Sequence, residues 1–294
     1  MSLTTKRRRI EKVLADDKTP KEVKEKLQIA VKLREFIEND LNLEMGDCYT
    51  TYVDLERPWA VKTLMVSDKC SIAAYTWSFP ILGKVPYLGF LKESSAIKKE
   101  KAFIAKDYDT YVRDAVAYST LGWFADPILS SITQLRDHDF IATIIHETVH
   151  LNIFKKGDME FNENIATFIE EEGTKRYLQK IDGIDSTLYK DYLISLERDK
   201  RKIVFLKGAL QELQRFYQQH QDCRKIKDVR EEKFREIEED FHRVFNDKIK
   251  VNNAYMVNIA LYHINYEDLL ETYHGRFKGD IKAFVGHYRD KHGN

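Results

Sequence analysis

The sequence predicts a helix-rich α+β protein, with a small antiparallel sheet in its first half and a mostly helical second half. Three observations predict this class. Only 12 glycines and 5 prolines occur among 294 residues, while 33% of the residues are charged. Segments rich in β-branched and aromatic residues are concentrated before Tyr118. From about Asp139 to the end, apolar residues recur at helical spacing.

The composition also excludes several classes of protein. Lys and Arg total 48, as do Asp and Glu, so the formal net charge is zero, whereas nucleic-acid-binding proteins usually carry a basic excess or stripe. Apolar residues make up 43% of the chain, too many for a disordered protein. No apolar run approaches the roughly 20 residues that span a bilayer. Cys48, Cys70 and Cys223 form no CxxC pair, so they indicate neither a disulfide framework nor a thiolate zinc site.

The first half of the sequence predicts one helix followed by strands. Apolar residues at helical spacing predict the helix over about 20–40, with Pro20 suited to its first turn. Strands are expected where β-branched and aromatic residues concentrate. These segments are 49–53, 59–66, 72–79 and 109–117. Glycine and proline interrupt the chain at 83–89, and a turn is expected at 122–127.

The second half of the sequence predicts helices throughout. Apolar residues recur at helical spacing over 203–213 and again over 234–244, with a break near 219–224, which predicts an antiparallel hairpin within 188–249. We prefer two amphipathic helices packed on the body of the protein, although the spacing also suits a coiled coil that binds a partner. No linker divides the chain, so one domain is expected over 1–294, with a helix and sheet lobe at 1–138 and a helical part at 139–294.

The most informative motif is HETVH at 146–150. On a helix, His146 and His150 lie about 40° apart around the axis and project to the same side. Two imidazoles at that spacing can bind one Zn²⁺ at about 2.0–2.1 Å. Glu147 lies about 100° from His146, where it can polarise a water molecule without ligating the metal. Isoleucine, valine and leucine residues flank the motif, so the helix is expected to be buried.

A catalytic zinc site needs a third protein ligand and leaves the fourth position to water. The motif helix is expected to end near 155–157, with Gly157 as its stop, and a second helix to begin around Asn162 and Glu163. A short connection returns the second helix antiparallel, so a residue in its first turn can face the metal. We select Glu163 as the third ligand. The alternatives that stay open are Glu170, Glu171 and Asp158.

Two other features of the second helix have a structural and a functional interpretation. The acidic run at 170–172 is interpreted as a solvated helix face. Thr167, one turn after Glu163, could hydrogen-bond a metal ligand, but a threonine that hydrogen-bonds within its own helix is the preferred interpretation.

The motif at 146–150 followed by NENIA at 162–166 resembles the gluzincin pattern, which is HExxH with a glutamate ligand on the next helix. More narrowly, the chain resembles the bacterial family of putative aminopeptidases. The segments that carry this resemblance are WSFP at 77–80 with Gly83, Tyr87 and Gly89, YSTLGWFADP at 118–127, KGD at 156–158, FNE at 161–163, ATF at 166–168 and NNA at 252–254. Two positions depart from the patterns, because Ser78 stands where this family more often has cysteine and Thr167 where gluzincins have aspartate.

The resemblance implies a zincin-like catalytic domain over the whole chain and one Zn²⁺ per chain. It also implies that the protein hydrolyses peptide bonds as an aminopeptidase. In that mechanism His146, His150 and Glu163 hold the zinc together with a water molecule, whose pKa the metal lowers toward about 7. Glu147 takes the proton of that water as it attacks the peptide carbonyl, and later returns it to the departing amine.

The oxyanion formed in this reaction needs at least one hydrogen-bond donor besides the metal. Tyr262 is the candidate, with His263 beside it, and packing within the helical bundle is the alternative for both residues.

The substrate is expected to pair with an edge strand, either at 109–117 or along 118–123. Tyr118, Gly122 and Trp123 are the candidate substrate contacts, and a purely structural turn is the alternative for the segment that follows. No carboxylate can be assigned from the sequence to the α-amino group of a substrate. The choice of aminopeptidase over endopeptidase therefore comes from the resemblance alone.

Two other functions are compatible with the sequence. One is a zincin-like binding or scaffold protein with little activity that uses the hairpin at 188–249, which the intact Glu147 disfavours. The other is a metallohydrolase acting on a non-peptide bond. The expected partner is a peptide substrate, without nucleic acid and without a membrane-spanning segment. Proteins of the resembling family look like envelope proteins with export signals, which favours the cell envelope or periplasm, with the cytoplasm as the alternative.

Overall fold

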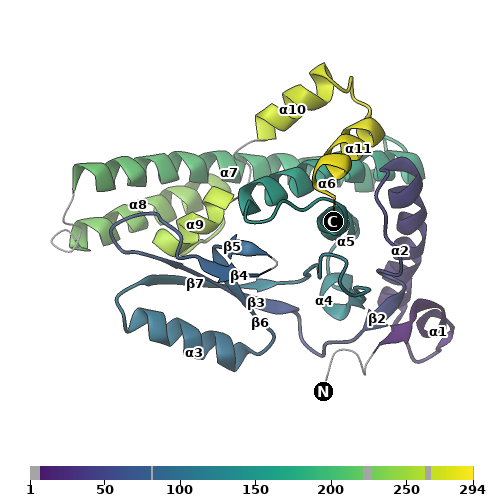
Figure 1. Ribbon diagram of the computed structural model, residues 1–294, viewed down its shortest axis with the longest axis horizontal. Coiled ribbons are helices and arrows are strands. Elements are labelled where there is room, and N and C mark those ends of the chain that lie inside the picture. Colours follow the sequence, from purple (N-terminus) through teal and green to yellow (C-terminus); the bar gives the residue numbers. More distant parts are fainter. Residues whose placement is uncertain (1–6, 81, 221–226, 262–265, 294) are drawn as a thin grey trace. The chain divides into compact units, whose positions relative to one another are not determined.

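The computed structural model describes residues 7–80, 82–220, 227–261 and 266–293 (Figure 1). The helices are α1 (Ile10–Ala15), α2 (Lys21–Asp40), α3 (Glu93–Ile104), α4 (Ser130–Thr133), α5 (Asp137–Asn152), α6 (Met159–Asp182), α7 (Thr187–Gln219), α8 (Lys227–Phe245), α9 (Asn253–Leu261), α10 (Tyr266–Gly275) and α11 (Ile281–His292). The strands are β1 (Arg8–Arg9), β2 (Thr51–Val53), β3 (Val61–Ser67), β4 (Trp77–Phe79), β5 (Gly83–Val85), β6 (Tyr87–Phe90), β7 (Asp109–Ala115) and β8 (Ile128–Leu129). The predicted helix-rich α+β class is confirmed.

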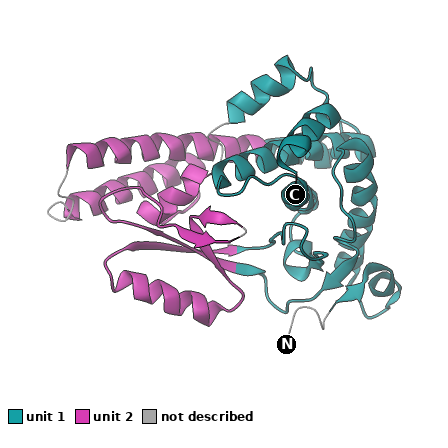
Figure 2. Cartoon of the chain, viewed as in Figure 1, with its two compact units in different colours: residues 1–61, 115–194, 265–294 teal, residues 62–114, 195–264 magenta. Residues whose placement is uncertain are grey.

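The chain forms two compact units, each assembled from stretches that are separated in the sequence (Figure 2). Unit 1 comprises residues 1–61, 115–194 and 265–294, and unit 2 comprises residues 62–114 and 195–264. The HETVH motif lies on α5 and therefore belongs to unit 1.

Unit 1 is built around α5, with α6 folded back along it and α2 packed against both helices. The two helices α5 and α6 approach closely at Gly173, where an added Cβ would lie 2.8 Å from a methyl group of Leu41 and 3.4 Å from Ile145. Because any side chain at Gly173 would push these buried residues apart, this glycine permits the close packing that brings α6 onto the motif helix.

Unit 1 also contains a small mixed sheet of order β1-β2-β8. Strand β2 pairs antiparallel with β1 and parallel with β8, where Tyr52 lies opposite Ile128. Parallel pairing places the segments that precede β2 and β8 at the same end of the sheet. This arrangement brings Cys48 and Tyr49, which lie shortly before β2, next to Asp126.

Unit 2 combines a three-stranded sheet of order β6-β3-β7 and the β4-β5 hairpin with α3, α8, α9 and most of α7. Leu64 and Val66 of β3 are buried in one cluster with Phe103 of α3. A second cluster joins α7, α8 and α9. Its most buried members are Leu213, Phe234, Phe241, Val251 and Met256. The apolar faces predicted for the helical hairpin are therefore largely covered by packing within unit 2.

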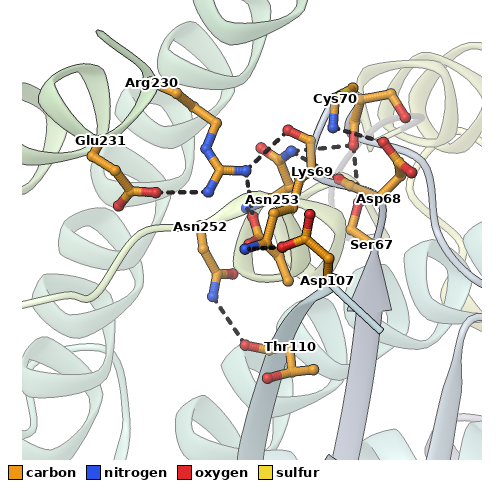
Figure 3. A network of polar contacts seen from close by, with 12 residues as sticks. Ser67, Asp68, Lys69, Cys70, Asp107, Thr110, Arg230, Glu231, Asn252 and Asn253 are labelled. Carbon is orange, nitrogen blue, oxygen red and sulfur yellow. Dashed lines mark hydrogen bonds and ion pairs between the residues drawn. The ribbon is translucent and has the colours of Figure 1, made fainter. Parts of the chain in front are cut away.

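A polar network in unit 2 fixes the start of α9 (Figure 3). The Asn253 side-chain amide donates to the backbone oxygens of Asp68 at 2.9 Å and Ser71 at 3.3 Å, and its oxygen accepts from the Tyr217 hydroxyl at 2.8 Å. Asn252 likewise donates to the Thr110 carbonyl at 2.9 Å. The Asn-Asn pair that contributed to the family resemblance thus has a structural role, because it ties α9 to the segments around β3 and β7.

The structure corrects three details of the predicted fold. The predicted single antiparallel sheet is wrong, because the strands form three separate small sheets and β2 pairs parallel with β8. Most of the expected strand at 72–79 is irregular, with only Trp77–Phe79 forming β4. The third detail concerns the strands β5 and β6, which form where glycine and proline were expected only to interrupt the chain. Strands β2, β8 and β6 depend on long-range pairing, which local composition does not report, whereas β4 and β5 pair with each other as a hairpin.

The boundaries of the two metal-site helices also differ from the prediction. Helix α5 ends at Asn152, before the expected stop at Gly157, and α6 begins at Met159 rather than at Asn162. Asp158 caps α6, since its carboxylate accepts the Phe161 N–H at 3.1 Å.

No helix in the described part of the chain is long and apolar enough to cross a membrane. Cys48 is free and buried, whereas Cys70 is disulfide-bonded, which the scattered cysteine positions did not indicate.

Candidate metal centre and active site

Both motif histidines lie on α5, whose apolar face is fully buried, as the sequence predicts. Ile141, Ile145 and Val149 have no exposed surface. His150 is buried and His146 is half-buried, so both imidazoles lie largely inside the protein. A buried imidazole is tolerated only when its polar atoms have partners, and α6 places carboxylates next to both nitrogens of His146 and next to Nε2 of His150.

The two histidines and Glu163 form a cluster with the spacing of a metal site. The Nε2 atoms of His146 and His150 are 3.2 Å apart. The Glu163 carboxylate oxygens lie 3.5 Å from the first Nε2 and 3.7 Å from the second. Two ligand atoms bound to Zn²⁺ in tetrahedral geometry lie about 3.3–3.4 Å apart, given bonds of about 2.0–2.1 Å. The three side chains therefore fit a tetrahedral ion, and they are the one such group among the described residues.

The loop between α5 and α6 holds Glu163 in this position. The Asn162 side chain accepts the backbone N–H of Lys155 at 2.7 Å and donates to the carbonyl of the same residue at 3.0 Å. Asn162 is fully buried, so this double hydrogen bond fixes the start of α6 relative to the end of α5. Glu163 is the next residue on the helix, and the sequence prediction that it faces the histidines is consistent with the structure.

Glu170 is the residue whose role the sequence interpretation missed. Its carboxylate lies 2.8 Å from Nδ1 of His146, a contact that holds the imidazole with Nε2 directed toward His150 and Glu163. Glu171 is also buried, and the Tyr266 hydroxyl donates to it at 2.5 Å. The interpretation of 170–172 as a solvated face is therefore wrong. Glu170 lies seven residues from Glu163, a spacing that returns to the same helix face, and this is the signal that kept Glu170 open as an alternative ligand.

The cluster has strongly perturbed proton affinities in the absence of a metal. Burial lowers the pKa of His146, but the hydrogen bonds that Glu163 and Glu170 accept from it, together with their negative charges, outweigh burial, so the net pKa is raised well above 6.5. Burial lowers the pKa of His150 to about 4. Burial also raises the pKa of Glu147 to about 7, with the charges of Glu163 and Asp126 among the further causes. A group of acids around two imidazoles, with such displaced pKa values, is typical of a functional site.

Two buried residues outside α5 and α6, Tyr49 and Asp126, interact electrostatically with Glu147. Burial raises the pKa of Tyr49 well above 10, and the charges of Glu147 and Asp126 add to the shift. The Tyr49 hydroxyl has no hydrogen-bond partner among the described residues, and the backbone of this tyrosine has a positive φ of 58°. Left-handed backbone in a bulky residue is strained and is concentrated at functional positions. Tyr49 cannot be identified from the sequence, because nothing in its local pattern distinguishes it from a strand residue.

The candidate substrate contacts Tyr118, Gly122 and Trp123 lie on the loop that precedes β8. Tyr118 is half-buried against the cluster that contains Val53 and Leu129. Gly122 forms the turn with φ of 79°, and Trp123 is 65% exposed. The loop ends at Asp126, which interacts electrostatically with Glu147. The roles of these three residues stay predictions.

Three other parts of the predicted site stay predictions. Tyr262 and His263 lie outside the described residues. Strand β7, the predicted edge strand for substrate, is at the edge of its sheet in unit 2. Thr167 is buried on α6, and its predicted hydrogen bond stays a prediction.

The fold and the site define a helix-rich α+β protein with a His-His-Glu cluster of metal-binding geometry on two adjacent helices. A family model described as "Putative aminopeptidase" matches residues 1–294, so the chain belongs to that family over its whole length. No curated protein and no solved structure matches the chain.

Proposed function

We propose that this protein is a zinc-dependent aminopeptidase of the zincin type. The observation that carries the proposal is the spacing of 3.2–3.7 Å among the metal-facing atoms of His146, His150 and Glu163, since it matches the edges of a zinc tetrahedron. Family membership supports the choice of peptide bonds as substrate. The metal identity and the reaction are inferences from this chemistry.

Zinc bound there would supply a Lewis acid that polarises the scissile carbonyl and makes water acidic. Glu147, the residue after His146 on α5, is then the base that takes the proton of the attacking water. Its pKa of about 7 in the metal-free protein falls when a divalent cation binds next to it, so the carboxylate is ionised at neutral pH. After the tetrahedral intermediate forms, Glu147 returns the proton to the departing amine.

Glu170 has a positioning role in this mechanism. Its hydrogen bond to Nδ1 of His146 fixes the tautomer in which Nε2 has a free lone pair. Such carboxylate partners also increase the basicity of the ligand and restrict the rotation of the ring. Glu170 thus takes the place that the sequence analysis considered for Thr167.

The first experiment measures zinc and peptide cleavage together on the full-length protein. We expect about one zinc per chain, removal of residues from the N-termini of a mixed peptide library, loss of cleavage with a chelator and recovery when zinc is restored. Absence of bound zinc, or zinc-loaded protein that cleaves no peptide, would contradict the proposal.

A second experiment isolates the base. Glu147→Gln is expected to retain zinc while turnover falls by about 10²–10⁴-fold, because only the proton acceptor is lost. Glu172→Gln is the matched control, since Glu172 pairs with Lys175 at 2.7 Å and not with the histidines. Full activity of Glu147→Gln would show that Glu147 is not the base.

A further inference from the structure

The loop before β8 buries a carboxylate with one oxygen left unpaired. Asp126 is only 2% exposed. Its Oδ2 accepts the backbone N–H of Thr120 at 2.8 Å, but its Oδ1 has no hydrogen-bond partner among the described residues. An unsatisfied oxygen on a buried carboxylate costs free energy in the folded state, so its retention calls for a ligand that pairs with it.

The surrounding structure holds this carboxylate firmly in place. The Asp126 N–H donates to the Cys48 sulfur at 3.3 Å, and its carbonyl accepts the Tyr49 N–H at 2.6 Å. The Thr120 hydroxyl closes the loop by donating to the Phe124 carbonyl at 2.9 Å. The carboxylate is therefore fixed from both its backbone and its side chain, as expected for a group that recognises a ligand rather than a mobile surface acid.

Asp126 is also buried and interacts electrostatically with the base Glu147. Its charge is among the causes that raise the pKa of Glu147 and of Tyr49, and Glu147 in turn raises the pKa of Tyr49. Arg7 is the cation that acts on Asp126, but burial has the larger effect, and the pKa of Asp126 is raised. The guanidinium of Arg7 donates to the neighbouring Ala125 carbonyl. The region is therefore rich in acids and suited to a ligand with positive charge.

Asp109, a buried aspartate in unit 2, is an example of a carboxylate with a purely structural role in this protein. Asp109 is 8% exposed. One of its oxygens accepts the Asn253 N–H at 3.1 Å and lies 3.5 Å from the Arg230 guanidinium. Asp109 thus has an oppositely charged partner within the protein, whereas Asp126 has no ion pair with a side chain in the described structure.

We propose that the free oxygen of Asp126 binds the α-ammonium group of the substrate, so that the enzyme acts on peptides with a free amino terminus. This inference rests on the proposed peptidase function. In an aminopeptidase substrate the α-nitrogen lies about 2.5 Å from the scissile carbonyl carbon, so its acceptor must lie close to the base. An ammonium group donates to a carboxylate through a charge-assisted hydrogen bond, and an acetylated terminus lacks both the charge and two of the donors.

The test compares two peptides of identical sequence, one with a free and one with an acetylated amino terminus. Wild type is expected to prefer the free peptide by at least about 10-fold in kcat/KM. Asp126→Asn is expected to lower that ratio at least about 10-fold, mainly through a higher KM for the free peptide. Asp109→Asn is the matched control, expected to lose stability and keep the ratio. Asp126→Ser, which keeps an oxygen for the Thr120 N–H, provides the same test if Asp126→Asn does not fold.

A binding measurement supplies a readout that does not depend on turnover. In the zinc-loaded Glu147→Gln background, calorimetry is expected to show that the free peptide loses affinity at least about 10-fold on adding Asp126→Asn, while the acetylated peptide does not. Wild type that cleaves both peptides equally, or Asp126 variants that keep the full preference, would overturn the inference and leave the peptidase function standing. A zinc-loaded wild type that binds and cleaves neither peptide would overturn both.

Discussion

The two units of this protein both bury charged groups, but they do so differently. In unit 2, Arg230 is 3% exposed and has Asp109 at 3.5 Å. Its guanidinium also has Glu231 at 2.6 Å and the Lys69 carbonyl at 3.0 Å (Figure 3). In unit 1, carboxylates surround two imidazoles, and the pKa values of the two histidines are displaced in opposite directions. One region balances its charges within the protein, and the other keeps an excess of acid.

This difference separates a structural network from a functional one. A buried charge that has partners can be kept for the sake of the fold, although it adds little net stability. A buried acidic cluster without matching cations destabilises the folded chain unless a ligand neutralises it. The site on α5 and α6 is such an acidic cluster, and a bound divalent cation would neutralise its negative charge as Arg230 does in unit 2. Substitutions in the two regions should therefore have different consequences.

The largest expected effect on stability comes from unit 2. Arg230→Met removes the cation and leaves Asp109 buried without its charged partner, so we expect unfolding to become easier by about 3–5 kcal/mol. Denaturant titration measures this change. Arg235→Met, an exposed position on the same helix, is the control and should change stability by less than about 0.5 kcal/mol. Similar losses for the two variants would contradict the structural role of the network.

In unit 1 the corresponding substitution should affect metal binding more than folding. Glu170→Ala removes the acceptor on Nδ1 of His146, and we expect zinc affinity to fall about 10–100-fold. Competition with a chromophoric chelator measures the affinity. Glu172→Ala, two residues further along α6, removes an ion pair with Lys175 and should leave zinc affinity unchanged. Equal affinities for wild type and Glu170→Ala would show that the contact does not orient the ligand.

The pH dependence of metal binding tests whether His146 in unit 1 carries a proton that zinc must displace. Because hydrogen bonding to Glu163 and Glu170 raises the pKa of the metal-free His146, this imidazole keeps its proton to a higher pH than a free imidazole and must lose it before Nε2 can bind zinc. Zinc affinity should therefore rise with pH, by about 10-fold per pH unit for each proton released. Proton release on loading at pH 7 is measured in a weakly buffered solution with an indicator dye. Loading without proton release would contradict the assigned charge state.

The sequence predicted the centre of the site better than its surroundings. HETVH lies within one helix, so the regular geometry of the helix brings His146 and His150 together without any long-range information. Glu163 required only the assumption that a short loop returns the next helix, and the three-residue error in the start of α6 did not change which face it presents. Glu170 was misassigned because a run of acids resembles a solvated face when the neighbouring helix is not known.

The remaining part of the site depends on contacts that a single sequence does not contain. Tyr49 and Asp126 are 77 residues apart in the chain and meet because β2 pairs parallel with β8. Both strands are too short to show a periodic pattern, which is also why the predicted antiparallel sheet was wrong. Asp126 lay within the segment that carried the family resemblance, yet its sequence, followed by proline, is equally typical of a turn. Burial and an unpaired oxygen distinguished it only in three dimensions.

The smallest expected effect compares two buried tyrosines of unit 1. Tyr273 donates its hydroxyl to the Gly279 carbonyl at 2.6 Å, so Tyr273→Phe should cost about 1 kcal/mol of stability. The Tyr49 hydroxyl has no partner among the described residues, so Tyr49→Phe should leave stability unchanged or raise it slightly, since it removes a buried polar group that is not hydrogen-bonded. Thermal and denaturant unfolding of both variants measure the difference. If Tyr49→Phe were as destabilising as Tyr273→Phe, its hydroxyl would have a structural partner, and the region around Glu147 would resemble the balanced network of unit 2.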